Sequence, residues 1–362
     1  MIMEARLAVT SVAVLSPYGH GVSDFVRGVR AGPAEFSVLQ DSYGLGPRVA
    51  KVPAYDARQL LATRAISHFD RLTQHVCIAA DQLHASLGFS DLAQRRALLA
   101  DERIAMVIGT SGPLQSVLDF DLQTIREPMY VQPSVYPNVV FNVPASYAAI
   151  RRSIRGSCIT LTNGDTSALD AFGVAAKQLG SGRYDLVLMG GTEEATAAYA
   201  LYQAARAATR QQECPPLCEG VVLFALERAE QAERRGQLSL AGLLGFANVF
   251  CPDPARGLRE CLRRLRQSCG TRLNDIGLLC AETRIDAAAL GIQARKRIDL
   301  FGTLGHTGAM YGATALLAAL ASDAAEPQEM LLILQNGADG ACSAALLQRQ
   351  ACFNSSCEIM PC

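Results

Sequence analysis

The sequence has no apolar run long enough to span a membrane and no leader-like start. Its hydrophobic stretches fall short of the roughly 18 consecutive apolar residues that a transmembrane helix needs. The opening residues alternate as a strand does and reach Pro17 without a signal-peptide cleavage pattern. These two absences predict a soluble protein of a reducing, cytoplasmic compartment.

The sequence also lacks an excess of charge of either sign. Its 362 residues include 33 basic and 34 acidic side chains, and the formal net charge is −1. A nucleic-acid-binding domain would need a strongly basic surface, so the composition predicts no nucleic-acid partner. Half of the residues are hydrophobic and 19% are charged, which excludes a disordered or coiled-coil chain.

No two cysteines have the Cys-x-x-Cys spacing of a metal or redox motif. The twelve cysteines are scattered singly, and the pair Cys214 and Cys218 has no second pair or histidine nearby to complete a zinc site. We therefore expect no metal and no cofactor. The cysteines are interpreted as small buried hydrophobic residues.

What the sequence does contain is an alternation of strand-like and helical segments. Short apolar runs predict strands, and periodic or alanine-rich stretches predict helices. The same alternation of strands and helices in both halves predicts an α/β protein with a duplicated architecture. The proline-rich residues 110–140 are expected to be irregular. The predicted strands lie at 6–15, 103–109, 157–162, 184–191, 221–228, 238–248, 276–282 and, as a hairpin, 330–349; the predicted helices lie at 21–31, 67–87, 166–179, 254–268 and 305–321.

Three turns could carry chemistry. At the first, a strand breaks at Asn163-Gly164 and enters a helix, so that Asp165 lies at a helix N-terminus, where an anion or an activated nucleophile is favoured. A plain N-cap fits that spacing equally well. At the second, His306 lies in a glycine-rich turn before an apolar helix, where it could donate to an oxyanion or be structural. The third, 336–340, lacks the spacing of a phosphate-binding loop, so an ordinary turn is its default interpretation.

Five segments together resemble those of a known family in their order along the chain. They lie at 6–32, 103–112, 153–195, 219–237 and 304–320, and they resemble the β-ketoacyl synthase family of the thiolase superfamily. The resemblance covers about residues 5–349. It implies a thiolase-like α/β fold with two pseudo-duplicated βαβ halves in five layers, αβαβα. The N-terminal half would span 1–230 and the C-terminal half 231–349, followed by a tail at 350–362.

The chain departs from this family where the resemblance places its chemistry. Active members use a cysteine nucleophile, two histidines and a lysine. When the segments are matched, Asp165 takes the place of the cysteine, Glu282 that of the first histidine and Phe301 that of the lysine, whereas His306 is retained. An aspartate cannot form the acyl thioester that condensation needs. These degenerate positions therefore predict a loss of condensing activity.

Such losses resemble the chain-length factor, or β subunit, of type II polyketide synthases. The resemblance implies a non-catalytic subunit that forms a heterodimer with an active ketosynthase, shapes the tunnel for its polyketide or polyene chain, and meets an acyl carrier protein. Many such subunits carry glutamine at the lost cysteine, so the aspartate fits a divergent branch of the polyene type.

The resemblance also implies where the partner and the growing chain would lie. Residues 110–141 would line the tunnel, and the strand at 157–162 would meet the partner. An equally weighted interpretation makes the aromatic residues of 110–141 part of a dimer core. The candidate tunnel and interface residues are Phe120, Met129, Tyr136, Phe141, Cys158 and Thr160, and the family's gate loop falls at Asn336 and Ala338.

Two other functions stay open. The chain could be an enzyme, either a malonyl-carrier-protein decarboxylase that uses His306 or an acyltransferase that uses Cys158 or Cys280. Cys158 is expected to be buried in its strand, and Cys280 lies two residues from the first-histidine position. The chain could also be a structural homodimer without a tunnel. The arginines at 151, 152 and 155, or those along 257–266, could steer the acidic carrier protein, although a solvated face is the favoured interpretation of the arginine-rich helix.

Overall fold

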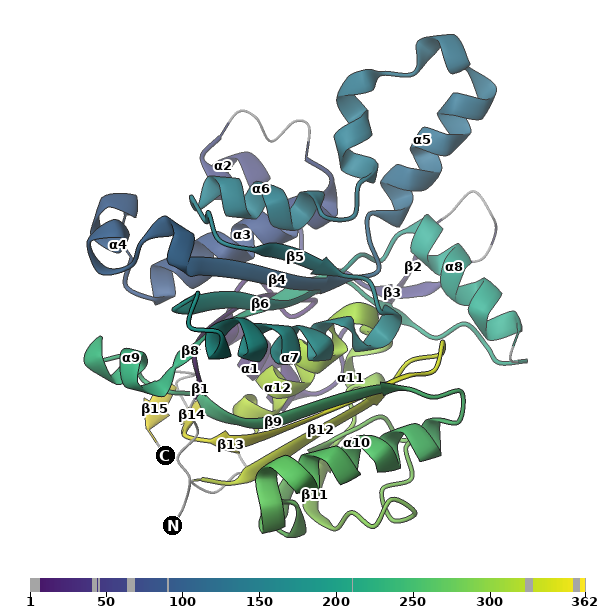
Figure 1. Ribbon diagram of the computed structural model, residues 1–362. Coiled ribbons are helices and arrows are strands. Elements are labelled where there is room, and N and C mark those ends of the chain that lie inside the picture. Colours follow the sequence, from purple (N-terminus) through teal and green to yellow (C-terminus); the bar gives the residue numbers. More distant parts are fainter. Residues whose placement is uncertain are drawn as a thin grey trace.

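A ten-stranded sheet made of two five-stranded halves is the framework of the molecule (Figure 1). The computed structural model describes residues 7–40, 44, 46–63, 69–89, 91–209, 211–322, 328–353 and 359–361. The first half has the order β1 (Leu7–Leu15), β8 (Gly220–Arg228), β6 (Leu186–Glu193), β4 (Ile104–Thr110) and β5 (Cys158–Leu161). The second half has the order β9 (Ala241–Phe250), β13 (Ala341–Arg349), β12 (Met330–Asn336), β10 (Ile276–Cys280) and β11 (Ala294–Ile298).

The two halves repeat the same strand directions. In each half, the first two pairings along the order are antiparallel and the last two are parallel. The halves join where β1 pairs with β9 in antiparallel fashion. The duplicated α/β architecture predicted from the sequence is therefore confirmed.

Helices lie between the two half-sheets and cover both outer faces (Figure 1). In the middle, α7 (Ser167–Gly180) and α12 (Tyr311–Ala321) share one continuous apolar core with strands of both halves. On the outside, α3 (Arg71–Ser86) and α6 (Val143–Arg151) pack on the first half, and α10 (Pro254–Cys269) packs on the second. The structure thus has the five layers that the resemblance implied.

The central helices tolerate burial on every side because they consist of small and apolar residues. All of α12 is buried, and its sequence has no charged side chain. Glycine allows α12 and α7 to approach closely, since a Cβ on Gly312 would lie 2.6 Å from the Cβ of Leu169. As a result, the turns that precede the two helices, 164–166 and 308–310, lie against each other.

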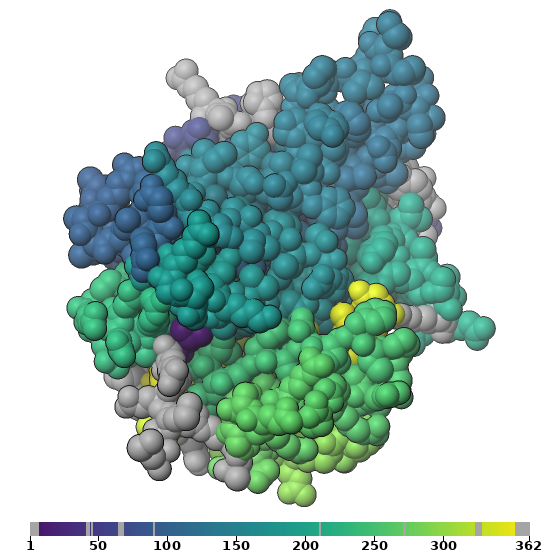
Figure 2. Space-filling model, in the orientation of Figure 1, coloured from purple at the N-terminus to yellow at the C-terminus, as the bar shows by residue number. Residues whose placement is uncertain are grey.

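One segment projects from the body of the molecule, and we call residues 114–142 the arm (Figures 1 and 2). It contains α5 (Leu114–Arg126) and two stretches of 3₁₀ helix, Pro128–Tyr130 and Pro133–Val139. The expectation of an irregular segment was wrong for α5, because the prolines lie outside it: Pro113 precedes its first turn and Pro128 follows its end. No residue of α5 is buried.

The remaining elements lie around this framework. The short strands are β2 (Ser37–Val38), β3 (Arg48–Ala50) and β7 (Leu217–Cys218) in a small sheet, and β14 (Ala351–Phe353) and β15 (Ile359–Pro361), which form a hairpin in the tail where the sequence shows no pattern. The other helices are α1 (Val22–Ala31), α2 (Ala57–Leu61), α4 (Leu92–Leu98), α8 (Ala197–Ala208), α9 (Ala229–Arg234) and α11 (Phe301–Leu304). The boundary at residue 230 falls within α9 and stays a prediction. Across the described ranges, no helix combines the length and the apolar character that crossing a membrane requires.

The described cysteines divide between the core and the surface. Cys77, Cys218, Cys261, Cys280 and Cys342 are buried, as expected. Cys158 and Cys214 are exposed, so the expectation of burial was wrong for them. In the case of Cys158 the reason is topological: β5 is the last strand of the sheet, so one of its sides has no neighbouring strand among the residues that the structure describes.

Candidate functional site

Asp165 lies at the junction between the edge strand β5 and the central helix α7. The chain turns there through a single turn of 3₁₀ helix, Gly164–Thr166. Gly164 has a φ of +61°, a left-handed conformation that glycine adopts without strain. Asp165 is 3% exposed, and its backbone carbonyl accepts a hydrogen bond of 2.5 Å from the side chain of Gln335. The turn thus holds a carboxylate inside the protein, in place of a free helix cap.

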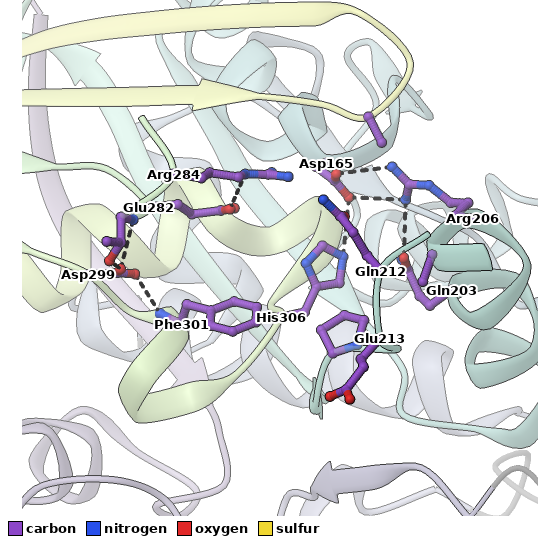
Figure 3. Close-up of a pocket in the computed structure, with 14 residues that line it drawn as sticks. Asp165, Gln203, Arg206, Gln212, Glu213, Glu282, Arg284, Asp299, Phe301 and His306 are labelled. Atoms are coloured by element: carbon purple, nitrogen blue, oxygen red, sulfur yellow. Dashed lines mark hydrogen bonds and ion pairs between the residues drawn. The ribbon is translucent and has the colours of Figure 1, made fainter. Parts of the chain in front are cut away.

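Two basic side chains from different parts of the chain converge on this carboxylate (Figure 3). Arg206, near the end of α8, contacts both oxygens of Asp165, with Nη2 to Oδ2 at 3.2 Å and Nη1 to Oδ1 at 3.4 Å. His306 places Nε2 3.4 Å from Oδ1, which is the separation of an ion pair and long for a hydrogen bond. The buried carboxylate is therefore flanked by a guanidinium and an imidazole.

Arg206 is the functional residue that the sequence reasoning missed. Neither α8 nor any of its residues was predicted, although the sequence offers a signal. In Ala197–Ala208, Arg206 is the sole charged side chain of an otherwise uncharged helix. Arg206 also lies over the ring of Tyr202, 5.2 Å from its centroid, which helps to orient the guanidinium toward the interior.

The position of His306 is fixed by its backbone. Its N–H donates to the carbonyl of Pro216 at 2.7 Å, and its carbonyl accepts from the N–H of Cys218 at 3.0 Å. Gly305 has a φ of +76°, and a Cβ there would lie 2.6 Å from the Pro216 oxygen. These hydrogen bonds hold the backbone of His306 beside β7, with its ring directed toward Asp165.

The two basic groups determine the charge of Asp165. Burial would raise the pKa of its carboxyl, but the attraction of His306 and Arg206 outweighs burial and holds the pKa well below its usual range. Burial would likewise lower the pKa of His306, but the Asp165 carboxylate outweighs it and raises the pKa above the usual 6.5. Asp165 is therefore ionised at neutral pH, and the pairing favours a protonated His306.

These residues line a cavity of about 390 Å³, together with the other two degenerate family positions, Glu282 and Phe301, and with Ala338 of the predicted gate loop. Glu282 is there, and its pKa is raised by burial against the opposing effect of Arg284, whose Nε lies 2.6 Å from Oε2. Phe301 faces the cavity from the start of α11, where its N–H donates to Asp299 at 2.9 Å. The lining is completed by Gln203, Ala207, Gln212, Glu213, Pro215, Thr283 and Ala338.

A second cavity, of about 550 Å³, adjoins the first. Gln212, Arg284 and Ala338 line both cavities. The wall of the second cavity also includes the loop 336–340 and the start of α10. Both residues of the predicted gate loop therefore line the second cavity, and Ala338 also lines the first.

The predicted tunnel and interface residues lie away from these cavities. Met129 is 89% exposed on the arm, and the rings of Phe120 and Tyr136 pack on each other with centroids 5.7 Å apart. Phe141, also on the arm, is at the border between half-buried and exposed. On β5, Cys158 is exposed, and the hydroxyl of Thr160 is buried with no hydrogen-bond partner within the described structure. In this single chain, Met129, Tyr136 and Cys158 are exposed, whereas Phe120 and Thr160 are half-buried.

Thiol chemistry has no suitable group in the first cavity. No cysteine is among its lining residues. Cys280 is fully buried, its thiol donates to the carbonyl of Ala315 at 3.6 Å, and burial raises its pKa to about 12. Desolvation by the surrounding protein also raises the pKa of Cys158, although this residue is exposed on the sheet edge. What the cavity offers is a paired carboxylate, an imidazole and a second carboxylate.

The described residues contain no group of three or more His, Cys, Asp and Glu side chains arranged to hold a metal ion. In the first cavity, Asp165 pairs with Arg206 and His306, and Glu282 pairs with Arg284.

Comparison with known proteins gives consistent matches. Residues 4–232 match the family model described as beta-ketoacyl synthase, N-terminal domain. The chain is 23% identical to 3-oxoacyl-[acyl-carrier-protein] synthase 2 of Coxiella burnetii, over 86% of this chain and 83% of the relative. It is 25% identical to the tetracenomycin polyketide synthase ketoacyl synthase beta subunit of Streptomyces glaucescens, over 71% of this chain and 67% of the relative.

A solved structure shares the fold of this chain. A solved structure titled the ishigamide ketosynthase/chain length factor superposes with a TM-score of 0.81 and 29% sequence identity, covering 95% of this chain and 99% of that one. The arrangement of a large mixed sheet around and between helices is thus the thiolase-like fold of ketosynthases.

Proposed function

Because the chain belongs to the β-ketoacyl synthase family, we propose that it is a non-catalytic chain-length factor that pairs with an active ketosynthase in a type II polyketide synthase. One observation carries the proposal. At the turn where the resemblance places the family's cysteine, Asp165 lies buried and paired with Arg206 and His306. At this position the chain has a buried carboxylate that is paired with two basic side chains, in place of a nucleophile.

The chemistry of condensation argues in the same direction. A condensing enzyme holds the growing chain as a thioester on its nucleophile and then stabilises the enolate of the extender unit. A carboxylate bound by a guanidinium is a poor nucleophile, and its anhydride with an acyl group would lack the stability of a thioester. A second carboxylate, Glu282, lines the same cavity where the family uses a histidine donor. An ionised carboxylate has no proton to donate to the enolate oxygen, as a histidine at that position would.

The surface supports a partner. Met129, Tyr130, Tyr136 and Ile125 on the arm are each more than half exposed, and this projecting segment carries them together. The edge strand β5 adds a row of main-chain groups that no other described strand of this chain pairs with on that side. Apolar patches and free strand edges of this kind mark interaction surfaces. The partner we propose is the active ketosynthase, whose polyketide or polyene chain would extend toward the aromatic residues of the arm.

A catalytic role is the alternative, with His306 acting in decarboxylation of a malonyl-carrier protein or a cysteine acting in acyl transfer. The burial of Cys280 and its raised pKa argue against acyl transfer by that thiol. The engagement of His306 by Asp165 argues against a free general acid or base. Full activity of a Cys280→Ala variant would remove the cysteine version of this alternative.

Co-expression with an active type II ketosynthase from the same genome tests the proposal. We expect a one-to-one heterodimer by size-exclusion chromatography and mass determination, with the chain insoluble or unstable alone. Enlarging the space at Phe120 or Tyr136 with alanine should lengthen the product of the heterodimer, whereas Leu98→Ala, on α4, should not. A self-contained homodimer that ignores the ketosynthase would overturn the proposal and favour a structural or catalytic role.

A further inference from the structure

Three cysteines gather where α10 packs on the second half-sheet. Cys251 directly follows the last residue of β9, Cys342 is the second residue of β13, and Cys261 lies on the buried face of α10. The thiol of Cys261 donates to the backbone carbonyl of Cys342 at 3.3 Å. None of the three lines the first cavity, and the proposed function uses none of them.

Cys251 and Cys342 meet over a single residue of α10. A Cβ on Gly257 would lie 3.1 Å from the Cβ of Cys251, 3.2 Å from the Cβ of Cys342 and 2.5 Å from its sulfur. The two side chains therefore point to the same face of the sheet and share the space that this glycine leaves open. A small movement brings them to the separation of about 3.8 Å between Cβ atoms that a disulfide requires.

The surrounding backbone allows that movement, because both cysteines lie beside loops. Cys251 opens the loop between β9 and α10, and Cys342 follows the loop between β12 and β13 by one residue. The two loops are joined where the N–H of Cys251 donates to the carbonyl of Gly340 at 2.8 Å. The thiol of Cys342 makes long contacts to the carbonyls of Gly340, at 3.8 Å, and Pro254, at 3.9 Å. The sulfur thus gives up only weak hydrogen bonds when it turns.

The two thiols differ in their access to solvent. Cys251 is half-buried, whereas Cys342 is 1% exposed. Burial also raises the pKa of Cys342 to about 11, so little of it is thiolate at neutral pH. An oxidant from solution therefore reaches Cys251 first, and Cys342 follows as the resolving thiol.

We propose that Cys251 and Cys342 form a reversible disulfide, which ties together the two loops that line the second cavity. Pro252 and Gly340 from these loops belong to its wall. A reducing compartment keeps both thiols free, and disulfides that form there are characteristically transient and redox-sensing. The bond would therefore report an oxidising change around the protein and fix the wall of the cavity in response.

The exchange partner that we propose is glutathione disulfide. The thiolate of Cys251 attacks one sulfur of glutathione disulfide and releases the first glutathione thiolate. The thiolate of Cys342 then attacks the sulfur of Cys251 in the mixed disulfide and releases the second. The two protein thiols are oxidised, glutathione disulfide is reduced, and the two thiol protons end on the two released glutathione molecules.

The test uses the full chain, purified alone or with a partner, because peptide mapping reads each chain separately. The chain is incubated with glutathione disulfide, its remaining thiols are blocked with iodoacetamide, and it is digested with trypsin without reductant. Trypsin releases Cys251 in residues 236–256 and Cys342 in residues 298–349, with no other cysteine in either peptide. The variants are Cys251→Ser, Cys342→Ala and, as the matched control, Cys269→Ser, a half-buried cysteine of the same helix.

We expect the two peptides to be linked in the unchanged chain and in Cys269→Ser, and to be released by dithiothreitol. Neither of the other variants should give the link, and Cys342→Ala should retain one glutathione on Cys251, because the resolving thiol is absent. Cys251→Ser changes a half-buried position, so it carries the test if Cys342→Ala does not fold. Free thiols throughout, a mixed disulfide that persists in the unchanged chain, or a link from Cys342 to Cys261 in place of Cys251 would each overturn the inference.

A second readout shows whether the bond fits the native structure. It closes a segment of about 90 residues, so oxidation should raise the Tm of the unchanged chain by about 5 °C and leave that of Cys251→Ser where it was. A Tm that falls or does not change would mean that the bond strains the folded chain, and would also overturn the inference. Neither readout needs a ketosynthase or a carrier protein, so the result does not depend on the proposed function.

Discussion

The cavity of Asp165 and the arm distribute polar and apolar groups in opposite ways. In the cavity, Asp165 lies inside the protein, 3% exposed, and is paired with Arg206 and His306. On the arm, apolar side chains lie outside the protein, with Met129 89% exposed and Tyr136 56% exposed. A buried charge is tolerated when its partners are in place, whereas exposed apolar surface is tolerated when something covers it. The cavity is therefore complete within this chain, and the arm is not.

Two properties of the chain, its stability and its affinity for a partner, therefore depend on different regions. Pairing among Asp165, Arg206 and His306 contributes to the stability of this chain whether or not a partner is bound. The arm contributes little to that stability, because no residue of α5 is buried. Substitutions in the two regions should accordingly affect different measurements, one the free energy of unfolding and the other the affinity for a partner.

Arg206→Met should give the largest effect, and it acts on stability. Removal of one partner of a buried ion pair leaves the other charge uncompensated, which costs about 3–5 kcal/mol at full burial. Because the side chain of Arg206 keeps 19% exposure, we expect a loss at the lower end, about 2–3 kcal/mol in the free energy of unfolding. Denaturant titration measures it.

The double variant Asp165→Asn with Arg206→Gln is the control for this prediction. It removes both charges and should recover much of the lost stability, because no isolated charge stays buried. Arg58→Met, on the surface, should change little. Equal stability of Arg206→Met and the unchanged chain would mean that the ion cluster does not stabilise the cavity.

Met129→Asp should give the next largest effect, and it acts on partner binding. Placing a carboxylate in the centre of an apolar interface should weaken the heterodimer with an active ketosynthase by about 2 kcal/mol, or roughly 30-fold in the dissociation constant. The free energy of unfolding of this chain should change by less than about 0.5 kcal/mol, because Met129 is exposed.

Leu98→Asp, on α4, provides the comparison, since this leucine is also exposed, at 61%, and lies away from the arm. It should leave ketosynthase affinity unchanged. If both aspartate variants weakened binding alike, the arm would have no special part in the interface. If neither did, the partner surface would lie elsewhere.

The sequence was sufficient for the framework because its periodic and apolar segments encode local structure. The strand from 103, the helix from 166 and the hairpin of 330–349 all formed close to where the pattern placed them. Five positions that the resemblance identified also line one cavity in the structure, although they span more than 170 residues: Asp165, Glu282, Phe301, His306 and Ala338.

What the sequence did not reveal depends on tertiary contacts. From the sequence, Arg206 resembles a surface residue on an alanine-rich helix. Its role follows from a tertiary contact, because α8 brings its guanidinium to the carboxylate of Asp165. Cys158 looks like a buried strand residue, and its exposure follows from β5 being the last strand of the sheet. In neither case does a local pattern contain the information, because the deciding contact is between distant segments.

A pH titration should give the smallest effect and refine the comparison. His306 has a folded-state pKa above its usual 6.5, so the stability that its pairing contributes is fully present below pH 6.5 and is lost as the pH rises through the raised value. Asp165 has a lowered pKa, so its contribution persists above the ordinary carboxyl range and is lost only in strong acid.

The free energy of unfolding of the unchanged chain, minus that of His306→Gln, should therefore decline from neutral to alkaline pH, by at most about 1.4 kcal/mol per pH unit. Over the same range the affinity of the arm for its partner should show no matching decline, because the apolar side chains that dominate it do not titrate in this way. A flat difference between the two chains would mean that Arg206 alone neutralises Asp165, and that His306 contributes to the cavity through packing and its backbone contacts with β7.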